Sequence, residues 1–300
     1  MYEDFGTILN RGFKTWVRNL NICIPFVLSF FGNFILSIFF FALIGVLFLA
    51  DSASMIDPTT LSNEELYSLL WNGFTNNIGS SIVLILAFSL IGLFIQAFFT
   101  AGAIGMAKKA SETGDTVFSD IFSSGSKNAF RLFLTNLMLA LMSLAGIVFI
   151  VPGALTIGDL SSLIENPQVP VEGMGVLSIG VLIWAIYLIA INIVFSTATY
   201  ALVIDELDPL DALKTGYNFF KENKLDVFFI WIITMGFALV NSLIGEALGN
   251  QSILISGITS FVPMFILSPL TAILWTRLYL VGKDRELYNP YYLLSDPEEF

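Results

Sequence analysis

The sequence predicts an all-α protein that crosses a lipid bilayer six times, and three observations lead to this prediction. Hydrophobic residues make up 56% of the 300 residues and the mean hydropathy is +0.82, more than a chain of this length can bury in water. Charged residues make up only 12%. They lie in short stretches between long apolar blocks, so lipid is the expected solvent for most of the chain.

The apolar blocks predict where the spans lie. Six runs without Asp, Glu, Lys or Arg reach 19 residues, close to the roughly 20 residues of helix that a bilayer core requires. They read as continuous Leu, Ile, Phe and Val rather than as alternating residues, which favours helices over a β-barrel. We therefore expect one transmembrane domain, residues 1–300. Its spans are predicted at about residues 20–50, 78–106, 132–155, 175–203, 226–247 and 253–280.

The distribution of basic residues predicts the orientation. All 13 Lys and Arg residues lie on one side of the predicted topology, and the loops on the opposite side carry acidic residues only. Loops rich in Lys and Arg stay in the cytoplasm when membrane proteins insert. Both termini are therefore expected in the cytoplasm, with the protein in the cytoplasmic membrane.

Three stretches on the predicted cytoplasmic side have apolar residues at helical spacing, and each leads into a pair of spans. Such helices are expected to lie in the headgroup plane, with the apolar face toward the acyl chains. The first covers residues 2–17, and the third begins at Asp208, ahead of Pro209. The second is expected to begin with a cap at Asp115 or Thr116. Its apolar stripe consists of Val117, Phe118, Ile121 and Phe122.

These stretches suggest three repeats, each an interfacial helix followed by a transmembrane pair. In the first two copies, Gly12, Lys14 and Arg18 match Gly125, Lys127 and Arg131 at equal spacing. The third copy fits with a register uncertain by one turn. The alternative is that any cytoplasmic loop ahead of a membrane helix becomes amphipathic and basic.

Local motifs predict three further features. Ser62 followed by Glu65 is a capping box that opens a short amphipathic helix in the first outer loop. Asn250 begins a sequon for N-glycosylation, and whether it is modified stays open. Pro263 and Pro269 are expected to kink or break the sixth span, and discontinuous helices can mark substrate sites.

Two segments carry a resemblance to a known set of proteins. The run Ala101–Ala110, followed by Gly114 and Asp115, and the run Asp205–Lys214 resemble uncharacterised prokaryotic multi-pass membrane proteins of unknown function. That set includes archaeal proteins and the membrane domain fused to some bacterial glycerophosphodiester phosphodiesterases. The resemblance implies the architecture and a place in a prokaryotic plasma membrane. It does not imply the phosphodiesterase activity, which belongs to a separate barrel domain with a catalytic histidine.

The composition excludes several kinds of chemistry. The chain contains no histidine and one cysteine, Cys23, so histidine-based catalysis, haem ligation by histidine and Cys/His zinc sites are excluded. It has no Gly-rich phosphate loop of the P-loop type. We expect no cofactor and no nucleic-acid partner.

The densest carboxylate cluster is Asp205, Asp208 and Asp211, at the predicted cytoplasmic surface. Three carboxylates could bind Mg²⁺ and a lipid diphosphate. Such enzymes need a second acidic motif, for which only Asp115 and Asp120 lie near. The favoured alternative is a capped helix with a solvated acidic start, so we expect no metal site.

Inside the spans, the amides Asn136, Asn192 and Asn241 stand out because ionisable residues are confined to the span ends. The absence of ionisable residues from the interior of the spans argues against proton coupling, pumping and the conduction of charged substrates. The amides are expected mainly to bridge helices. The alternative is a polar lining for a substrate cavity.

The function expected from the sequence is non-enzymatic: an assembly factor, a lipid-organising protein or an accessory subunit. The first alternative is a permease or flippase for an apolar or lipid-like substrate, and the second is a Mg²⁺-dependent lipid-processing enzyme. Membrane lipids are the expected partners, with other membrane proteins as an open alternative. The sequence does not predict an oligomeric state.

The orientation can be tested with topology reporters. A reporter fused after Ser54 should lie outside the cytoplasm, and reporters fused after Glu112 or Lys221 should lie inside, because of the basic asymmetry. Activity of matched phosphatase and fluorescent-protein fusions measures the side. A reporter on the wrong side at any of these positions would rule out the six-span topology.

Overall fold

The computed structural model describes residues 4–49, 62–157, 171–249 and 252–288. All regular elements in these ranges are helices, and six of them are long and apolar enough to cross a membrane, which confirms the predicted fold class. These six candidate spans are Leu20–Leu47, Ile78–Thr113, Ser119–Thr156, Met174–Asp205, Lys224–Leu248 and Leu254–Gly282. The sequon at Asn250 falls outside the described residues.

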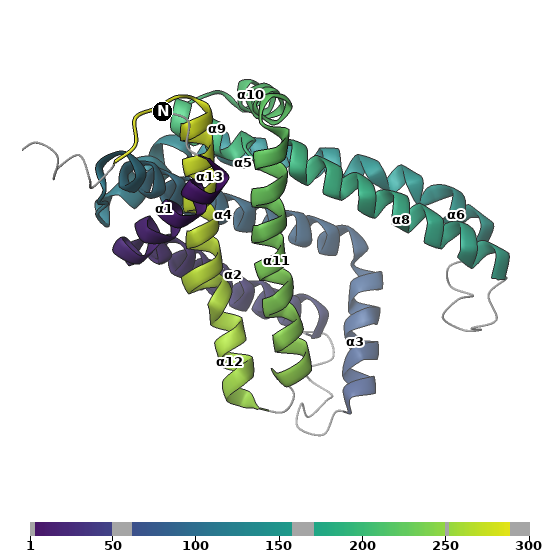
Figure 1. The fold of residues 1–300 in the computed structure, drawn as a ribbon. Coiled ribbons are helices and arrows are strands. Elements are labelled where there is room, and N and C mark those ends of the chain that lie inside the picture. The colour runs from purple at the N-terminus through teal and green to yellow at the C-terminus, as the bar shows by residue number, and fades with distance from the viewer. Residues whose placement is uncertain (1–3, 50–61, 158–170, 250–251, 289–300) are drawn as a thin grey trace, which may run out of the picture.

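The elements form three helical hairpins that diverge from a common base (Figure 1). The first hairpin is α2 (Ile24–Leu49) with α4 (Ile78–Thr113). In the second, α5 (Ser119–Ala145), η2 (Gly146–Phe149) and α6 (Val151–Ile157) together pair with α8 (Val171–Val194). The third is α11 (Lys224–Gly249) with α12 (Ile253–Val262). The base consists of α1 (Phe5–Arg18), η1 (Leu20–Cys23), α9 (Ala198–Asp205), α10 (Pro209–Glu222) and the end of α13 (Ser268–Gly282), which follows α12 through η3 (Pro263–Leu267). α3 (Asn63–Asn76) joins the first hairpin far from the base.

The most deeply buried helix is α13, at the centre of the base. Almost every side chain from Leu270 to Val281 is buried, including those of Arg277 and Tyr279. The outer halves of the hairpins instead expose large apolar side chains, which is the pattern expected of surfaces that face lipid. The packed core therefore lies at the base, and the hairpins extend from it.

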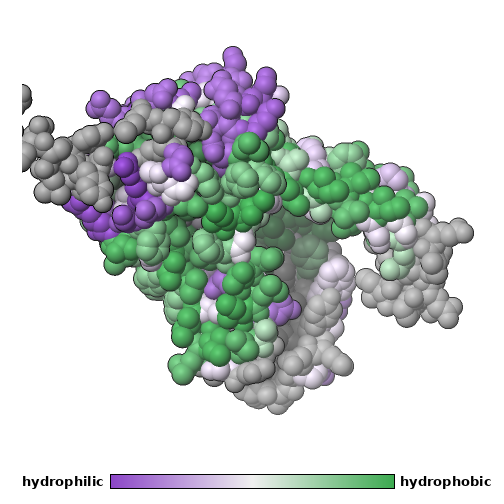
Figure 2. Space-filling model, viewed as in Figure 1, coloured by the Kyte–Doolittle hydropathy of each residue, from purple (hydrophilic) through white to green (hydrophobic). Residues whose placement is uncertain are grey.

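Charged residues gather at the base, where Figure 2 shows hydrophilic colours over α1, α10 and the end of α13. Ion pairs tie the base segments together. They join Arg18 to Asp115, Lys109 to Asp120, Lys127 to Glu206, and Arg285 to both Glu112 and Asp205. Most of these pairs are solvent-exposed, so each contributes at most about 1 kcal/mol.

The three repeats pack in a closed ring. In each copy, one glycine lies against the second span of the preceding hairpin, and the first copy contacts the last hairpin. The glycine contacts are Gly12 with Leu274 of α13, Gly125 with Phe98 of α4, and Gly216 with Ala198 of α9, where an added Cβ would lie 2.6, 3.0 and 2.8 Å from its nearest neighbour. This ring resolves the register of the third copy, because Gly216 takes the place of Gly12 and Gly125.

A second buried position supports the same alignment. The residue four positions before each glycine is Ile8, Ile121 or Ala212, and each is at most 2% exposed. The copies differ in one respect: α1 and α10 end before the next span begins, whereas α5 continues from the base into the hairpin without a break.

Two predictions for the second copy are wrong. Ile121 was expected to face the acyl chains, but it is fully buried against α4 because Gly102 leaves room for it, at 2.9 Å from an added Cβ. No cap lies at Asp115 or Thr116. Asp115 pairs with Arg18 at 3.0 Å, and the amide of Val117 donates instead to the carboxylate of Asp120 at 2.8 Å.

The capping box in the first outer loop is confirmed. The amide of Glu65 donates to Ser62 Oγ at 3.3 Å, and the amide of Ser62 donates to Glu65 Oε2 at 2.9 Å. Two of the amides at the start of α3 are thereby satisfied, as the motif requires. The amide and the hydroxyl of Ser62, which both donate to the Glu65 carboxylate, hold its pKa below the usual value.

The ring of glycine contacts predicts that Gly216→Ala destabilises the protein. The new methyl group would lie 2.8 Å from backbone atoms of Ala198, which cannot move like the end of a side chain. Overpacking typically costs about 1–3 kcal/mol, against a gain of up to about 1 kcal/mol in helix propensity. Thermal unfolding in detergent should therefore give a lower midpoint than the wild type.

The matched control is Gly236→Ala in the interior of α11, where nothing lies within 4 Å of the added Cβ. It should leave the midpoint unchanged or raise it. Equal midpoints for the two variants would contradict the close approach of α10 to α9.

Candidate functional site

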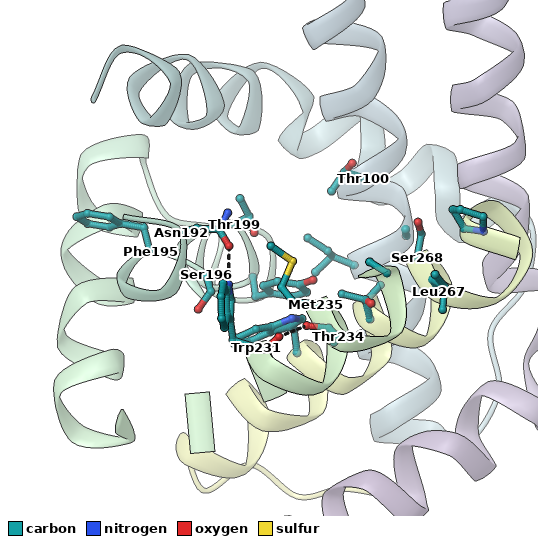
Figure 3. A pocket seen from close by; sticks show the side chains of 18 of the residues that line it. Thr100, Asn192, Phe195, Ser196, Thr199, Trp231, Thr234, Met235, Leu267 and Ser268 are labelled. Atoms are coloured by element: carbon teal, nitrogen blue, oxygen red, sulfur yellow. Dashed lines mark hydrogen bonds between the residues drawn. The ribbon is translucent and has the colours of Figure 1, made fainter. Parts of the chain in front are cut away.

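A cavity of about 680 Å³ lies between the hairpins, next to the base (Figure 3). Its volume is within the roughly 300–1,000 Å³ typical of small-molecule sites. Side chains from α2, α4, α5, α8, α9, α11, η3 and α13 line it. No charged side chain is among the described residues that line the cavity, and its polar groups are hydroxyls, amides and the indole N–H groups of two tryptophans. The aromatic members are Phe26, Phe195, Tyr200, Trp231 and Trp275.

One wall of the cavity is formed where the sixth span is interrupted. The π-helical segment η3 begins at Pro263 and connects α12 to α13, so the helix is locally distorted where a kink or break was expected. Proline has no N–H, so the carbonyl of Thr259, four residues earlier, loses its usual donor. The side-chain amide of Asn241 on α11 donates to this carbonyl at 3.0 Å. Asn241 therefore satisfies an acceptor that would be costly to leave unpaired in lipid.

A second wall is formed where the fourth span is interrupted. Between α8 and α9, the amides of Ser196 and Ala198 donate to the carbonyls of Ile193 and Phe195, three residues back, at 3.4 and 3.0 Å. Each bond is one residue shorter than in an α-helix, so the carbonyls of Asn192 and Val194 lose their usual donors. No proline or glycine marks this break, and the sequence analysis missed it. The available signal was the run Ser196-Thr197, since such side chains compete for helical carbonyls.

A hydrogen bond crosses the cavity from α11 to α8. The indole Nε1 of Trp231 donates to Asn192 Oδ1 at 2.7 Å, the dashed line between these residues in Figure 3. Asn192 and Asn241 thus line one cavity, as the polar-lining alternative expected, and both also bridge helices. Asn136 on α5 is not among the lining residues.

The three aspartates at the base do not converge on one point. Asp205 at the end of α9 accepts from the Tyr279 hydroxyl at 2.6 Å and pairs with Arg285. Asp208 takes the expected cap position before Pro209, but its side chain makes no capping bond and lies 3.6 Å from Arg131. Asp211 lies in the first turn of α10. In the part of the chain that the structure describes, no group of three carboxylates could hold a metal ion.

The segment between α9 and α10 is held by basic residues of α5. Lys127 pairs with Glu206 at 2.5 Å, and Arg131 donates to the Glu206 carbonyl at 2.9 Å. The Lys127 ammonium keeps the pKa of the Glu206 carboxyl below its usual value. The acidic cluster thus pairs with the basic residues around it, and no single ligand set is assembled from it.

Comparisons with known proteins identify a family but no activity. A family model described as "Domain of unknown function (DUF7847)" matches residues 27–281. No curated protein matches the chain, and no solved structure matches it. The function must therefore be argued from the cavity and the base.

The role assigned to Asn241 can be tested by a double-mutant cycle with Pro263. Asn241→Leu should lower the free energy of unfolding by about 0.6–2 kcal/mol, because it leaves the Thr259 carbonyl without a donor in lipid. In a Pro263→Ala background, residue 263 regains its N–H and the same substitution should cost less. Steric trapping or chemical denaturation in detergent measures the four proteins. Equal costs in both backgrounds would contradict this account of Asn241.

Proposed function

We propose that this chain, which belongs to the DUF7847 family of unknown function, is a non-enzymatic membrane protein that binds a lipid-like molecule in its cavity. One observation carries the proposal: the cavity lies among apolar helices, has no charged group among its lining residues and is built at two helix interruptions. Broken helices at bilayer depth are tolerated where they line a cavity, and they recur at binding sites.

Access from the bilayer supports a lipid over a water-soluble ligand. Beside α11 and beneath the α8 hairpin, the molecular surface is hollowed and coloured hydrophobic (Figure 2). Exposed apolar side chains cover the surrounding helices, among them Ile189 on α8 and Ile232 on α11. A molecule that enters here would come from the acyl-chain region and would leave its tail in that region.

The lack of ionisable groups on the cavity wall supports binding over ion-coupled chemistry. Proton and ion pathways in membranes are built from carboxylates, basic residues or histidines. The aspartates that could have supported a metal-dependent lipid enzyme point instead at Arg285, Tyr279 and Arg131. We therefore propose that the protein organises or carries a lipid and does not modify it.

The orientation proposed for this activity places the base in the cytoplasm. The base holds the basic residues of α1, α5, α10 and α13, and loops rich in Lys and Arg remain on the cytoplasmic side. The cavity would then open toward the membrane interior from the cytoplasmic half of the protein. Location in a prokaryotic plasma membrane remains part of this proposal.

A permease or flippase is the second candidate function. It is favoured by the two interrupted spans, since discontinuous helices that meet at one site allow the two sides of a transporter to move against each other. Movement of a fluorescent lipid analogue across proteoliposome membranes distinguishes transport from binding alone.

Lipid binding can be tested by filling the cavity. Ala238 lines the cavity from α11, so Ala238→Phe should displace the bound lipid. Ala247→Phe is the matched control, because Ala247 is an exposed residue of the same helix and is not among the lining residues. Native mass spectrometry of the proteins, purified in mild detergent, should find a lipid adduct on the wild type and the control. Absence of an adduct from the wild type, or equal adducts on both variants, would contradict the proposal.

A further inference from the structure

The hydrogen-bonding groups of the cavity wall restrict which lipid it can hold. Hydroxyls that line the cavity donate their protons to their own helices: Thr234 to the carbonyl of Ile230 at 2.9 Å, Ser196 to that of Ile193 at 2.8 Å, and Ser143 to that of Leu139 at 2.8 Å. A hydroxyl that has given away its proton presents only lone pairs. These three side chains therefore face the cavity as acceptors.

The interruption between α8 and α9 adds a further acceptor. The carbonyl of the lining residue Asn192 loses its helical donor there, because the amide of Ser196 donates to Ile193 instead. The Trp231 indole, a donor, is already used by Asn192 Oδ1. The side-chain NH₂ of Asn192 is the donor that this part of the wall retains. A ligand at this part of the wall must therefore both donate and accept hydrogen bonds.

The charge of the lipid headgroup restricts the choice of ligand further. A phosphate brings negative charge to a wall that, among the described lining residues, has no cation. Burying an unpaired charge in such a site is strongly unfavourable. An ammonium head would likewise meet no carboxylate among these residues. A hydroxyl is uncharged, donates one proton and accepts from a neighbour, so it satisfies both requirements.

The geometry of the hairpins indicates where the tail lies. α8 and α11 belong to different hairpins, which separate with distance from the base in Figure 1, and the Trp231–Asn192 bond joins them near the base. A cavity of about 680 Å³ equals roughly 20 water-sized volumes, enough for a head and the first part of its chains. The remaining chain length would leave past the hollowed apolar surface beside α11, where Ile189 on α8 and Ile232 on α11 are exposed (Figure 2).

We propose that the cavity binds an uncharged lipid alcohol, whose hydroxyl bonds to the side chain and the main-chain carbonyl of Asn192. Its chains extend sideways into the bilayer past the hollowed surface beside α11 (Figure 2). This inference rests on the proposed lipid-binding function and names the chemistry of the ligand. Asn192 is the specificity-determining residue, because its NH₂ donates to the alcohol oxygen while its main-chain carbonyl accepts the alcohol proton.

The experiment compares two probes that share their chains and differ by a phosphate: 1,2-dioleoylglycerol and dioleoylphosphatidic acid. Binding of each to the full-length protein in nanodiscs or mild detergent is measured by native mass spectrometry over a range of lipid concentrations. The wild type should bind dioleoylglycerol saturably and dioleoylphosphatidic acid at least about 10-fold more weakly.

Matched substitutions at different positions test where the head of the lipid binds. Asn192→Leu should weaken dioleoylglycerol binding by about 2- to 10-fold, the range expected for loss of one net hydrogen bond. Asn136→Leu is the matched control, since it makes the same change on α5 at a residue that is not among the lining residues, and it should bind like the wild type. Asn192→Ala also removes the NH₂ donor but adds no bulk, so it should weaken dioleoylglycerol binding as Asn192→Leu does. Binding of dioleoylglycerol to Asn192→Ala as tight as to the wild type would contradict the assignment of Asn192, even if Asn192→Leu fails to fold.

The outcomes separate this inference from the proposal on which it rests. Equal affinity for the two probes, with both lost in Ala238→Phe, would overturn the alcohol assignment and leave the lipid-binding function standing. Equal affinities of Asn192→Leu and Asn136→Leu for dioleoylglycerol would overturn the role of Asn192. Saturable binding of neither probe, with no adduct from the native membrane, would overturn both proposals.

Discussion

In a bilayer, every main-chain N–H and C=O must find a partner within the protein, and the architecture of this chain depends on that constraint. It explains why every regular element in the described ranges is a helix. It also explains why interruptions are informative. The carbonyl of Thr259, deprived of a donor by Pro263, receives one from Asn241 on the neighbouring helix. The carbonyl of Asn192, deprived of its helical donor by the turn before α9, belongs to a residue that lines the cavity.

The molecule separates close packing at the base from the cavity beside it. At the base, glycines such as Gly12 and Gly216 let the base helices approach the spans closely, and α13 is buried at their centre. Ion pairs connect the segments at this end. Beyond the base, the three hairpins diverge, and the space between them becomes the cavity (Figures 1 and 3). The ring of contacts at the base holds the three repeats together, so the hairpins can diverge beyond the base without loss of the fold.

Much of the fold could be predicted from the sequence because it follows from local patterns. Hydrophobic length predicts the spans, the Ser62 and Glu65 pair predicts the start of α3, and Pro263 predicts the distortion in the sixth span. What could not be predicted depends on contacts between distant segments. The partner of Asp115 is Arg18, and the room that buries Ile121 comes from Gly102. The dependence on contacts between distant segments also explains why the residues of the candidate site could be predicted only in part. Asn192 and Asn241 share the cavity but Asn136 does not, because only the packing of α8 against α11 decides which amides meet.

The central claim is that the cavity between α8 and α11 holds the head of an uncharged lipid, and photo-crosslinking tests it most directly. A diacylglycerol with a diazirine next to its glycerol backbone would be incorporated into membranes that contain the protein, irradiated, and mapped by peptide mass spectrometry. The account predicts that labels concentrate on the cavity-lining segments around Asn192 and Trp231 and decline when unlabelled dioleoylglycerol is added. Labels spread evenly over the exposed faces of the hairpins, with no competition, would contradict it.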